Sequence, residues 1–198
     1  MQPAAAAAAA ACPCKGSRFL LNTWSAAQHG DEGRLRHLLR DHARDPDKLD
    51  EYGRAPLHFA AAGGHAGCVA LLLRHGADAN ASACGALPLH RAAYGGHAGV
   101  VSQLLAAGSR RDDRDAATGD LRTPLAKAAA CGHAAVCRLL LAAGADAATS
   151  DARGRAPWQL VPAAPGGGEL ELLRAALARG AGVPDAELGA FREGLGDS

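Results

Sequence analysis

The sequence predicts an all-α solenoid of about five helix–turn–helix units. One observation is a set of prolines spaced by 32, 36 and 33 residues: Pro56, Pro88, Pro124 and Pro157. A second is a set of glycines spaced by 34, 32 and 36 residues: Gly30, Gly64, Gly96 and Gly132. Two independent markers with nearly the same period indicate a repeat array. The third observation is that 48% of residues are apolar but only 4% are aromatic, which favours closely packed helices.

The clearest unit is "APLHFAAAGGHAGCVALLLRHGADANA", residues 55–81. Pro56 suits the first helical position, where its missing N–H removes no helical hydrogen bond. We expect Gly63-Gly64 to stop this helix, because glycine accepts the left-handed conformation of a C-terminal cap. The apolar stretch that follows predicts a second helix ending at Gly76. Helices below about 12 residues are marginal alone, so the units must stack to share a core.

The other units follow in order and become irregular at both ends. The unit "WSAAQHGDEGRLRHLLRDHA" lacks the proline entry, and the last, "RGRAPWQLVP", meets Pro162, which should stop its first helix early. Irregular end units are expected of caps. The predicted units are 22–48, 49–81, 82–112, 113–149 and 150–180. They lie in a repeat domain, 18–180, between a disordered alanine-rich head, 1–17, and a C-terminal tail, 181–198.

These units resemble ankyrin repeats, whose pattern is roughly G-x-TPLHxAAxxGHxxVVxLLLxxGAxxNA. Residues 53–81 match nearly every fixed position, and the resemblance covers about residues 22–179. It implies a non-enzymatic module or adaptor that binds another protein. The resemblance also implies that β-hairpin-like fingers join the helix pairs, and that the binding surface is a concave face made by the finger tips and the first helices.

The chain departs from this pattern at three places. The pattern's threonine is replaced at Ala55, Leu87 and Ala156, which implies that a family threonine–histidine hydrogen bond is missing there. The pattern's histidine is replaced at Ala126 and Gln159. The finger that contains "RRDDRDAATGDLR", residues 110–122, is three residues longer than the standard one, and the preceding finger is one shorter.

Two pairs of histidines have the spacing of possible ligands. His58 and His65, like His90 and His97, are seven residues apart, but a Gly-Gly break lies between the members of each pair. The pairs therefore need not share a helix face. Histidines that bond to the backbone at repeat junctions explain the spacing equally, and their loss at Ala126 favours this structural interpretation.

The six cysteines leave an alternative function open. Cys68 and Cys137 fall at apolar positions of second helices, where a small hydrophobic side chain fits. No paired C-x2-C groups predict a zinc site. Cys12-Pro-Cys14 is the basis of the alternative, a cysteine-dependent metal-binding or redox protein. Without a recognisable targeting segment, we expect free thiols and a cytoplasmic and/or nuclear protein.

Charge and motifs exclude several other classes. Basic and acidic residues number 21 and 20, so the net charge of +1 predicts no nucleic-acid partner. The longest apolar run, residues 4–11, is far below the ~20 residues of a membrane helix. No P-loop, nucleotide-binding glycine set, G-x-S-x-G or HExxH occurs, so we expect no enzyme and no cofactor. The charged residues of the long finger are interpreted as a solvated loop.

The resemblance places the candidate partner-binding residues at the variable positions of the first helices and on the fingers. They are Ser25, Gln28, His29, Tyr52, Arg54, Phe59, Arg91, Tyr94, Lys127, Arg153 and Arg155. Aromatic and arginine side chains in one band are typical of binding hot spots. Arg54, Arg91, Lys127 and Arg155 make this band basic. We therefore expect a monomer whose protein partner offers an acidic or phosphorylated segment.

Overall fold

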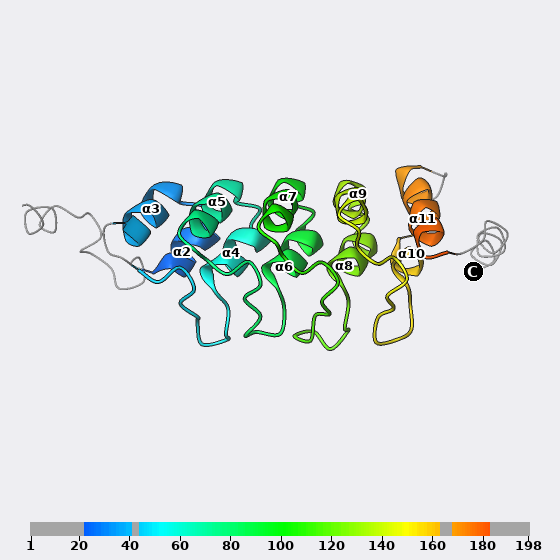
Figure 1. Cartoon of the computed structure of the whole chain (residues 1–198), viewed down its shortest axis with the longest axis horizontal. Coiled ribbons are helices and arrows are strands. Elements are labelled where there is room, and N and C mark those ends of the chain that lie inside the picture. Colours follow the sequence, from blue (N-terminus) through cyan, green and yellow to red (C-terminus); the bar gives the residue numbers. More distant parts are fainter. Residues whose placement is uncertain (1–21, 41–43, 163–167, 183–198) are drawn as a thin grey trace, which may run out of the picture.

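A computed structural model describes residues 22–40, 44–162 and 168–182. Within these ranges the chain forms ten helices and no strand, arranged as five successive pairs (Figure 1). The predicted all-α repeat solenoid is confirmed. None of the described helices has the length and apolar composition of a membrane span. The predicted head, Cys12, Cys14 and nearly all of the predicted tail lie outside the described residues.

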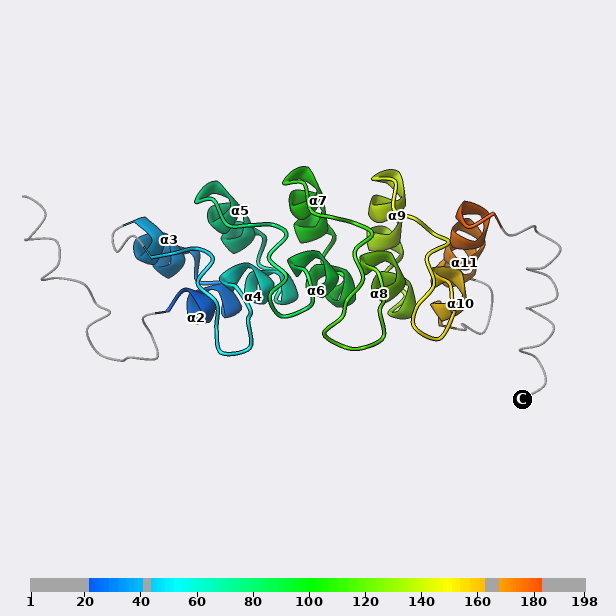
Figure 2. The ribbon, with the colours of Figure 1, turned by 60° about the horizontal axis from the view of Figure 1, so that its bottom comes forward.

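The helices form two layers (Figures 1 and 2). The first helices of the pairs are α2 (Thr23–Gln28), α4 (Pro56–Ala62), α6 (Pro88–Gly95), α8 (Pro124–Ala130) and α10 (Pro157–Leu160). The second helices are α3 (Glu32–Arg40), α5 (Ala66–Arg74), α7 (Ala98–Ala106), α9 (Ala134–Ala142) and α11 (Glu169–Gly180). Within each layer, every helix contacts the next one along the row. A helix of four to twelve residues is therefore held mainly by its neighbours.

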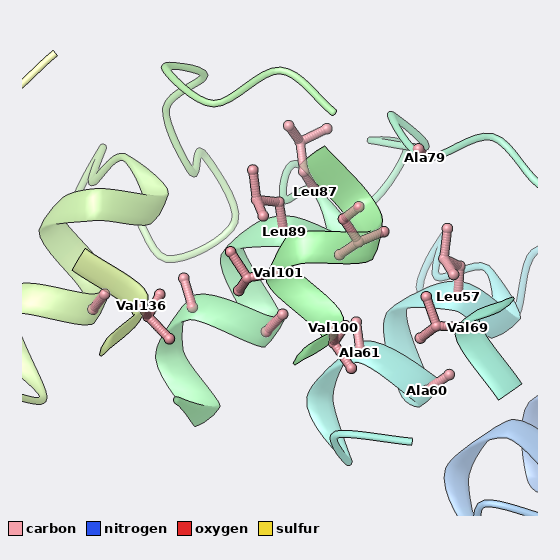
Figure 3. Close-up of a cluster of buried hydrophobic side chains, with 14 of the residues drawn as sticks. Leu57, Ala60, Ala61, Val69, Ala79, Leu87, Leu89, Val100, Val101 and Val136 are labelled. Atoms are coloured by element: carbon pink, nitrogen blue, oxygen red, sulfur yellow. The ribbon is translucent and has the colours of Figure 1, made fainter. Parts of the chain in front are cut away.

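Pairs of alanines let the first helices approach one another. These fully buried pairs are Ala26-Ala27, Ala60-Ala61, Ala92-Ala93 and Ala128-Ala129. The second helices add buried leucines and valines, and one continuous core runs through all five units. Figure 3 shows part of this core, including Ala60, Ala61, Leu89 and Val101. Alanine fits here because it brings two backbones close without leaving a cavity.

A glycine of one repeat and a histidine of the next join the first four repeats to one another. Gly64 ends the first-helix turn with φ of +71°, as the sequence predicted. The imidazole of His97, in the next unit, packs against it, and Nε2 of His97 donates to the carbonyl of Ala62 at 3.0 Å. His65 and His133 make the same contact with Gln28 and Tyr94. The structural interpretation of these histidines is confirmed.

Hairpin-shaped loops, the fingers, connect the helix pairs and project to one side (Figure 1). They are finger 1 (44–55), finger 2 (75–87), finger 3 (107–123) and finger 4 (143–156). In three of them one backbone bond closes the loop: Asp50 N–H to Arg54 O, Asp115 to Arg122 and Asp151 to Arg155. The two bonded residues are four positions apart in fingers 1 and 4 but seven positions apart in finger 3. The predicted three-residue extension is therefore located inside this loop.

The last unit is truncated as predicted. The helix α10 ends at Leu160, and Val161, which precedes Pro162, has the extended conformation (φ −61°, ψ 125°) that proline imposes on its predecessor. The buried Arg174 of α11 donates to the carbonyl of Val161 at 2.7 Å. A carbonyl left without a helical partner is thus satisfied by the neighbouring helix.

The glycine–histidine junction predicts a difference between two glycines of one unit. Both Gly64 and Gly76 have positive φ, but a Cβ on Gly64 would lie 2.5 Å from Nδ1 of His97, whereas a Cβ on Gly76 would meet nothing within 4 Å. We expect Gly76→Ala to lower the free energy of unfolding by about 1 kcal/mol. Gly64→Ala should cost a further ~1–3 kcal/mol because of the clash.

Urea unfolding followed by far-UV circular dichroism measures both losses. Because His97→Ala also removes the hydrogen bond to Ala62, the double variant is compared with His97→Ala alone; in that background Gly64→Ala should cost only the ~1 kcal/mol expected of Gly76→Ala. Equal losses for the two glycine variants would contradict the proposed role of the junction.

Candidate partner-binding face

The first helices and the fingers share one face of the solenoid, the inner face, and two hollows open on it. The N-terminal hollow, of 730 Å³, is lined by Asn22, Trp24, Ser25, Gln28, His29, Asp50, Glu51, Tyr52, Arg54 and Phe59. The central hollow, of 520 Å³, is lined by His90, Arg91, Tyr94, Thr118, Asp120, Arg122, Lys127, Ala130 and Cys131. Nine of the eleven candidate residues line one or the other. Arg153 and Arg155, on finger 4, line neither.

An arginine clamp shapes the N-terminal hollow. The Arg54 guanidinium lies over the rings of Tyr52, at 4.9 Å, and Phe59, at 4.7 Å. Its Nε and Nη2 each lie 2.8 Å from Oδ2 of Asp50. Phe59 also packs on the core, whereas 66% of the Tyr52 surface is exposed. The clamp therefore fixes Arg54 and leaves Tyr52 as the free aromatic surface.

The helix α2 supplies the other wall of this hollow. Asn22 caps α2 by accepting from the Ser25 N–H at 2.6 Å. Nδ1 of His29 lies 2.8 Å from the carbonyl of Ser25, while Gln28 is exposed. Trp24 is held by its indole N–H, which donates to the carbonyl of Lys48 at 2.6 Å. Three candidate residues are thus brought beside Tyr52 and Arg54, as the sequence predicted.

Finger 3 changes the ion pairing at the central hollow. In the shorter fingers, Asp50 and Asp151 pair with the arginine four positions later, Arg54 and Arg155. In finger 3 the corresponding aspartate, Asp115, is fully buried and pairs instead with Lys127 of α8, at 2.5 Å. The extension has moved the finger's own arginine away, and a first-helix lysine takes its place. The interpretation of this finger as a solvated loop is therefore wrong at Asp115.

The displaced arginine, Arg122, lies between two weaker partners. Its Nη1 is 3.7 Å from Oδ2 of Asp120, and its Nε is 3.6 Å from Oδ2 of Asp151 of finger 4; this Nε–H donates no hydrogen bond within the described residues. Leu121, beside it, has φ of +51°, the one positive φ outside glycine in the described residues. The carbonyl of Asp120 accepts from Ala152 at 2.8 Å, which ties finger 3 to finger 4.

Arg91 and Tyr94 are the accessible side chains of the central hollow. Arg91 occupies on α6 the place that Lys127 has on α8, but it makes no ion pair with any described residue. Tyr94 exposes 64% of its surface. Lys127 exposes only 8%, so this candidate offers a partner little contact. In the structure Lys127 instead forms the ion pair that neutralises the buried Asp115.

The inner face is less basic than the sequence indicates. Of the four cations of the expected band, Arg54, Lys127 and Arg155 each pair with a carboxylate. Burial would raise the pKa of Asp151, but hydrogen bonds from Arg155 and Arg153 and the Arg155 charge together lower it to about 2. Of the four cations expected to make this band basic, only Arg91 therefore remains unpaired among the described residues, because finger carboxylates neutralise the other three.

The histidines of the helix entries are structural. Nδ1 of His90 accepts from the Leu87 N–H at 3.0 Å, and its Nε2 donates to the carbonyl of Asp113 at 2.9 Å. His58 bridges Ala55 and Ala86 in the same way. Burial lowers the pKa of both, that of His90 to about 4. These neutral imidazoles join α4 and α6 to the fingers that follow them, which supports the predicted scaffold role.

The described cysteines are free thiols. Cys68 and Cys137 are fully buried, as predicted, and burial raises the pKa of Cys68 to about 11 and that of Cys137 to about 12. In residues 22–40, 44–162 and 168–182 there is no group of three His, Cys, Asp or Glu arranged to hold a metal ion. Cys12-Pro-Cys14, the basis of the alternative function, lies outside these ranges.

Several residues of the two hollows were not among the candidates. They are Asn22, Trp24, Asp50, Glu51, His90, Thr118, Asp120, Arg122, Ala130 and Cys131. Half of them belong to the fingers, where a position in the repeat does not tell which way a side chain points. One signal was available for Arg122: it precedes the helix entry by the same two residues as Arg54 and Arg155 precede theirs.

The comparison with protein families agrees with this architecture. The family description "Ankyrin repeats (3 copies)" matches residues 23–115 and 85–151, together more than half of the chain. This chain belongs to the ankyrin repeat family. Ankyrin repeats are protein–protein interaction modules, typically without enzymatic activity, so the class of this protein is a protein-binding repeat solenoid.

Similar proteins share only part of this chain. Human ankyrin repeat domain-containing protein 39 is 41% identical over 63 residues, 32% of this chain and 34% of that protein. Human ankyrin repeat domain-containing protein 35 is 33% identical over 75 residues, 34% of this chain and 8% of that protein. Delta-latroinsectotoxin-Lt1a of Latrodectus tredecimguttatus is 51% identical over 47 residues, which are 24% of this chain and 4% of that protein. The matched region spans about a third of the first relative's length.

The buried ion pair predicts that Lys127 and Arg91, which occupy corresponding positions on their helices, contribute very differently to stability. Lys127→Met leaves the Asp115 carboxylate buried and unpaired, so we expect the free energy of unfolding to fall by about 3 kcal/mol. The matched control Arg91→Met removes a cation without an ion pair and should change it by less than about 0.5 kcal/mol. Urea unfolding of both variants measures the difference. Similar losses would show that Lys127 does not stabilise finger 3.

The neutral His90 predicts a loss of stability in acid. Because folding lowers the pKa of His90 from its usual 6.5 to about 4, protonation favours the unfolded chain. The stabilisation that comes from a neutral His90 is fully present above pH 6.5 and is lost as the pH falls toward 4. The free energy of unfolding should therefore fall by about 2–3 kcal/mol between pH 7.5 and 4.5.

Urea unfolding at several pH values tests this dependence. The control is His90→Gln, because Gln159 of the last unit already accepts from its N-cap N–H at 2.8 Å without titrating. The pH dependence of His90→Gln should be shallower than that of the unsubstituted protein. Parallel curves would contradict the assignment.

Proposed function

We propose that this protein is a non-enzymatic adaptor that binds another protein along the inner face. The observation that carries the proposal is the placement of two exposed tyrosines at two hollows of one face. Tyr52 and Tyr94 expose 66% and 64% of their surfaces, and each lines a hollow walled by a finger and first helices. Tyrosine offers a large contact area with few rotatable bonds, so little entropy is lost on binding.

The rigidity of the face supports the same proposal. Three of the four fingers are closed by a backbone bond and carry an ion pair, and the first helices that support them are fixed by buried alanines. A surface already ordered before association loses less conformational freedom than a mobile one. The residues proposed to contact the partner are Ser25, Gln28, His29, Tyr52, Phe59, Arg91 and Tyr94, with Arg54 held in its clamp.

We also propose that the protein works inside the cell, in the cytoplasm and/or the nucleus, as a monomer. The free thiols of the described cysteines suit a reducing compartment. Arg153, exposed on finger 4, extends the proposed face toward its C-terminal end. The paired Arg155 beside it contributes mainly through its aliphatic part.

Affinity capture with purified full-length protein tests the proposed face. Tyr52→Ala and Tyr94→Ala should each weaken binding of a specific captured partner by about 10- to 30-fold, the loss typical of a hot-spot residue. Binding is measured on the recovered partner by biolayer interferometry, with circular dichroism to confirm retained helicity.

The matched control is Leu172→Ala. Leu172 exposes 72% of its surface on α11, in the layer of second helices, and removing it should leave binding unchanged. If Leu172→Ala weakened binding as much as the tyrosine variants, or if neither tyrosine mattered, the partner would lie elsewhere and the proposal would fail.

A further inference from the structure

We infer that the partner contributes an extended segment with an uncharged aromatic or aliphatic side chain in the N-terminal hollow and a carboxylate or phosphate in the central hollow. This inference rests on the proposed function and specifies the chemistry of the partner. It follows from three features of the inner face: Arg54 is already engaged by Asp50, Tyr52 and Phe59, Arg91 has no ion pair among the described residues, and the repeats have a regular spacing.

The N-terminal hollow disfavours an anionic side chain, and Arg54 already occupies the position over its aromatic rings where a cationic side chain would bind. Its lining holds two carboxylates, Asp50 and Glu51, against one guanidinium, so an anionic side chain would be repelled. A cationic side chain would meet Arg54, which already lies over Tyr52 and Phe59. What remains accessible is aromatic surface, chiefly the exposed Tyr52. An uncharged aromatic or aliphatic side chain is the complement of that surface.

The central hollow has the opposite balance. Three cations line it against a single carboxylate, Asp120, whose contact with Arg122 is 3.7 Å long. Lys127 is used by Asp115, but Arg91 has no ionic partner among the described residues. The exposed Tyr94 shares its helix and its hollow. Arg91 and the hydroxyl of Tyr94 therefore offer donors to an incoming carboxylate or phosphate, and arginine bonds such groups in a bidentate manner.

The repeats set the distance between the two positions. The N-terminal hollow lies between the first and second helix pairs, and the central hollow between the third and fourth. Adjacent packed helices are about 8–10 Å apart, so the hollows are separated by two such steps, about 20 Å. An extended chain rises about 3.3 Å per residue, which gives a separation of about six residues.

Selection from a phage library of random 12-residue peptides against the immobilised full-length protein tests this inference. We expect enriched sequences to carry an aromatic or large aliphatic residue and, about five to seven positions away, Asp or Glu. A synthetic copy of the enriched peptide, and a second copy with phosphoserine at the acidic position, then serve as labelled probes in fluorescence anisotropy. Both anionic probes should bind.

Charge reversal identifies which hollow reads which end of the peptide. Arg91→Glu should weaken the acidic peptide by about 10- to 100-fold and improve a peptide with Lys at the acidic position. Tyr52→Ala should weaken both peptides by about tenfold. The control Arg179→Glu makes the same charge change on α11, whose exposed Arg179 lines neither hollow, and should alter affinity less than about threefold.

The outcomes separate this inference from the proposed function. Enriched peptides without the spacing, or with an acidic residue insensitive to Arg91→Glu, overturn the inference while protein binding by the inner face stands. Absence of any enriched peptide also overturns it, and the proposed function is then decided by the capture experiment with Tyr52→Ala and Tyr94→Ala. Loss of the captured partner's binding in those variants would retain the function without this class of ligand.

Discussion

The close approach of short helices is the constraint on which the rest of this protein depends. No first helix exceeds eight residues, so none would persist without its neighbours. Paired alanines such as Ala60 and Ala61 bring these helices together, and glycines such as Gly64 leave room for the histidine of the next unit. Because every unit is fixed by the unit beside it, the fingers start from defined positions and the inner face is rigid.

The fingers show how one insertion redistributes charge. An aspartate near each of three finger tips accepts backbone N–H bonds and needs a cation. In fingers 1 and 4 the arginine four residues later supplies it, whereas finger 2 has Ser82 and Ala86 at these places. The longer finger 3 separates Asp115 from Arg122, and Lys127 replaces that arginine. A residue at a partner-facing position of the repeat has thereby become structural.

This redistribution of ion pairs also determines where the inner face carries unpaired charge. Arg54 and Arg155 are neutralised locally, and Lys127 is buried, which leaves Arg91 as the cation of the two hollows that has no ion pair with any residue the structure describes. The selectivity of such a face depends less on its net charge than on which charges are unpaired before a partner binds. A charge that is already paired and desolvated contributes little additional binding energy. The two hollows therefore differ in chemistry although their repeats are alike.

The sequence alone determined the repeat, the helix pairs, the truncated last unit and the structural histidines, because these depend on local chemistry: proline at a helix start, glycine at its end and alanine between helices. It also predicted that the variable positions of the first helices share one face, since position in a repeat fixes the face of a helix; that these residues line two hollows is known only from the structure. Only the tertiary structure decided which charges are free. Ion pairs such as Lys127 with Asp115 join residues twelve positions apart through the path of a finger, and a linear pattern carries no information about that path.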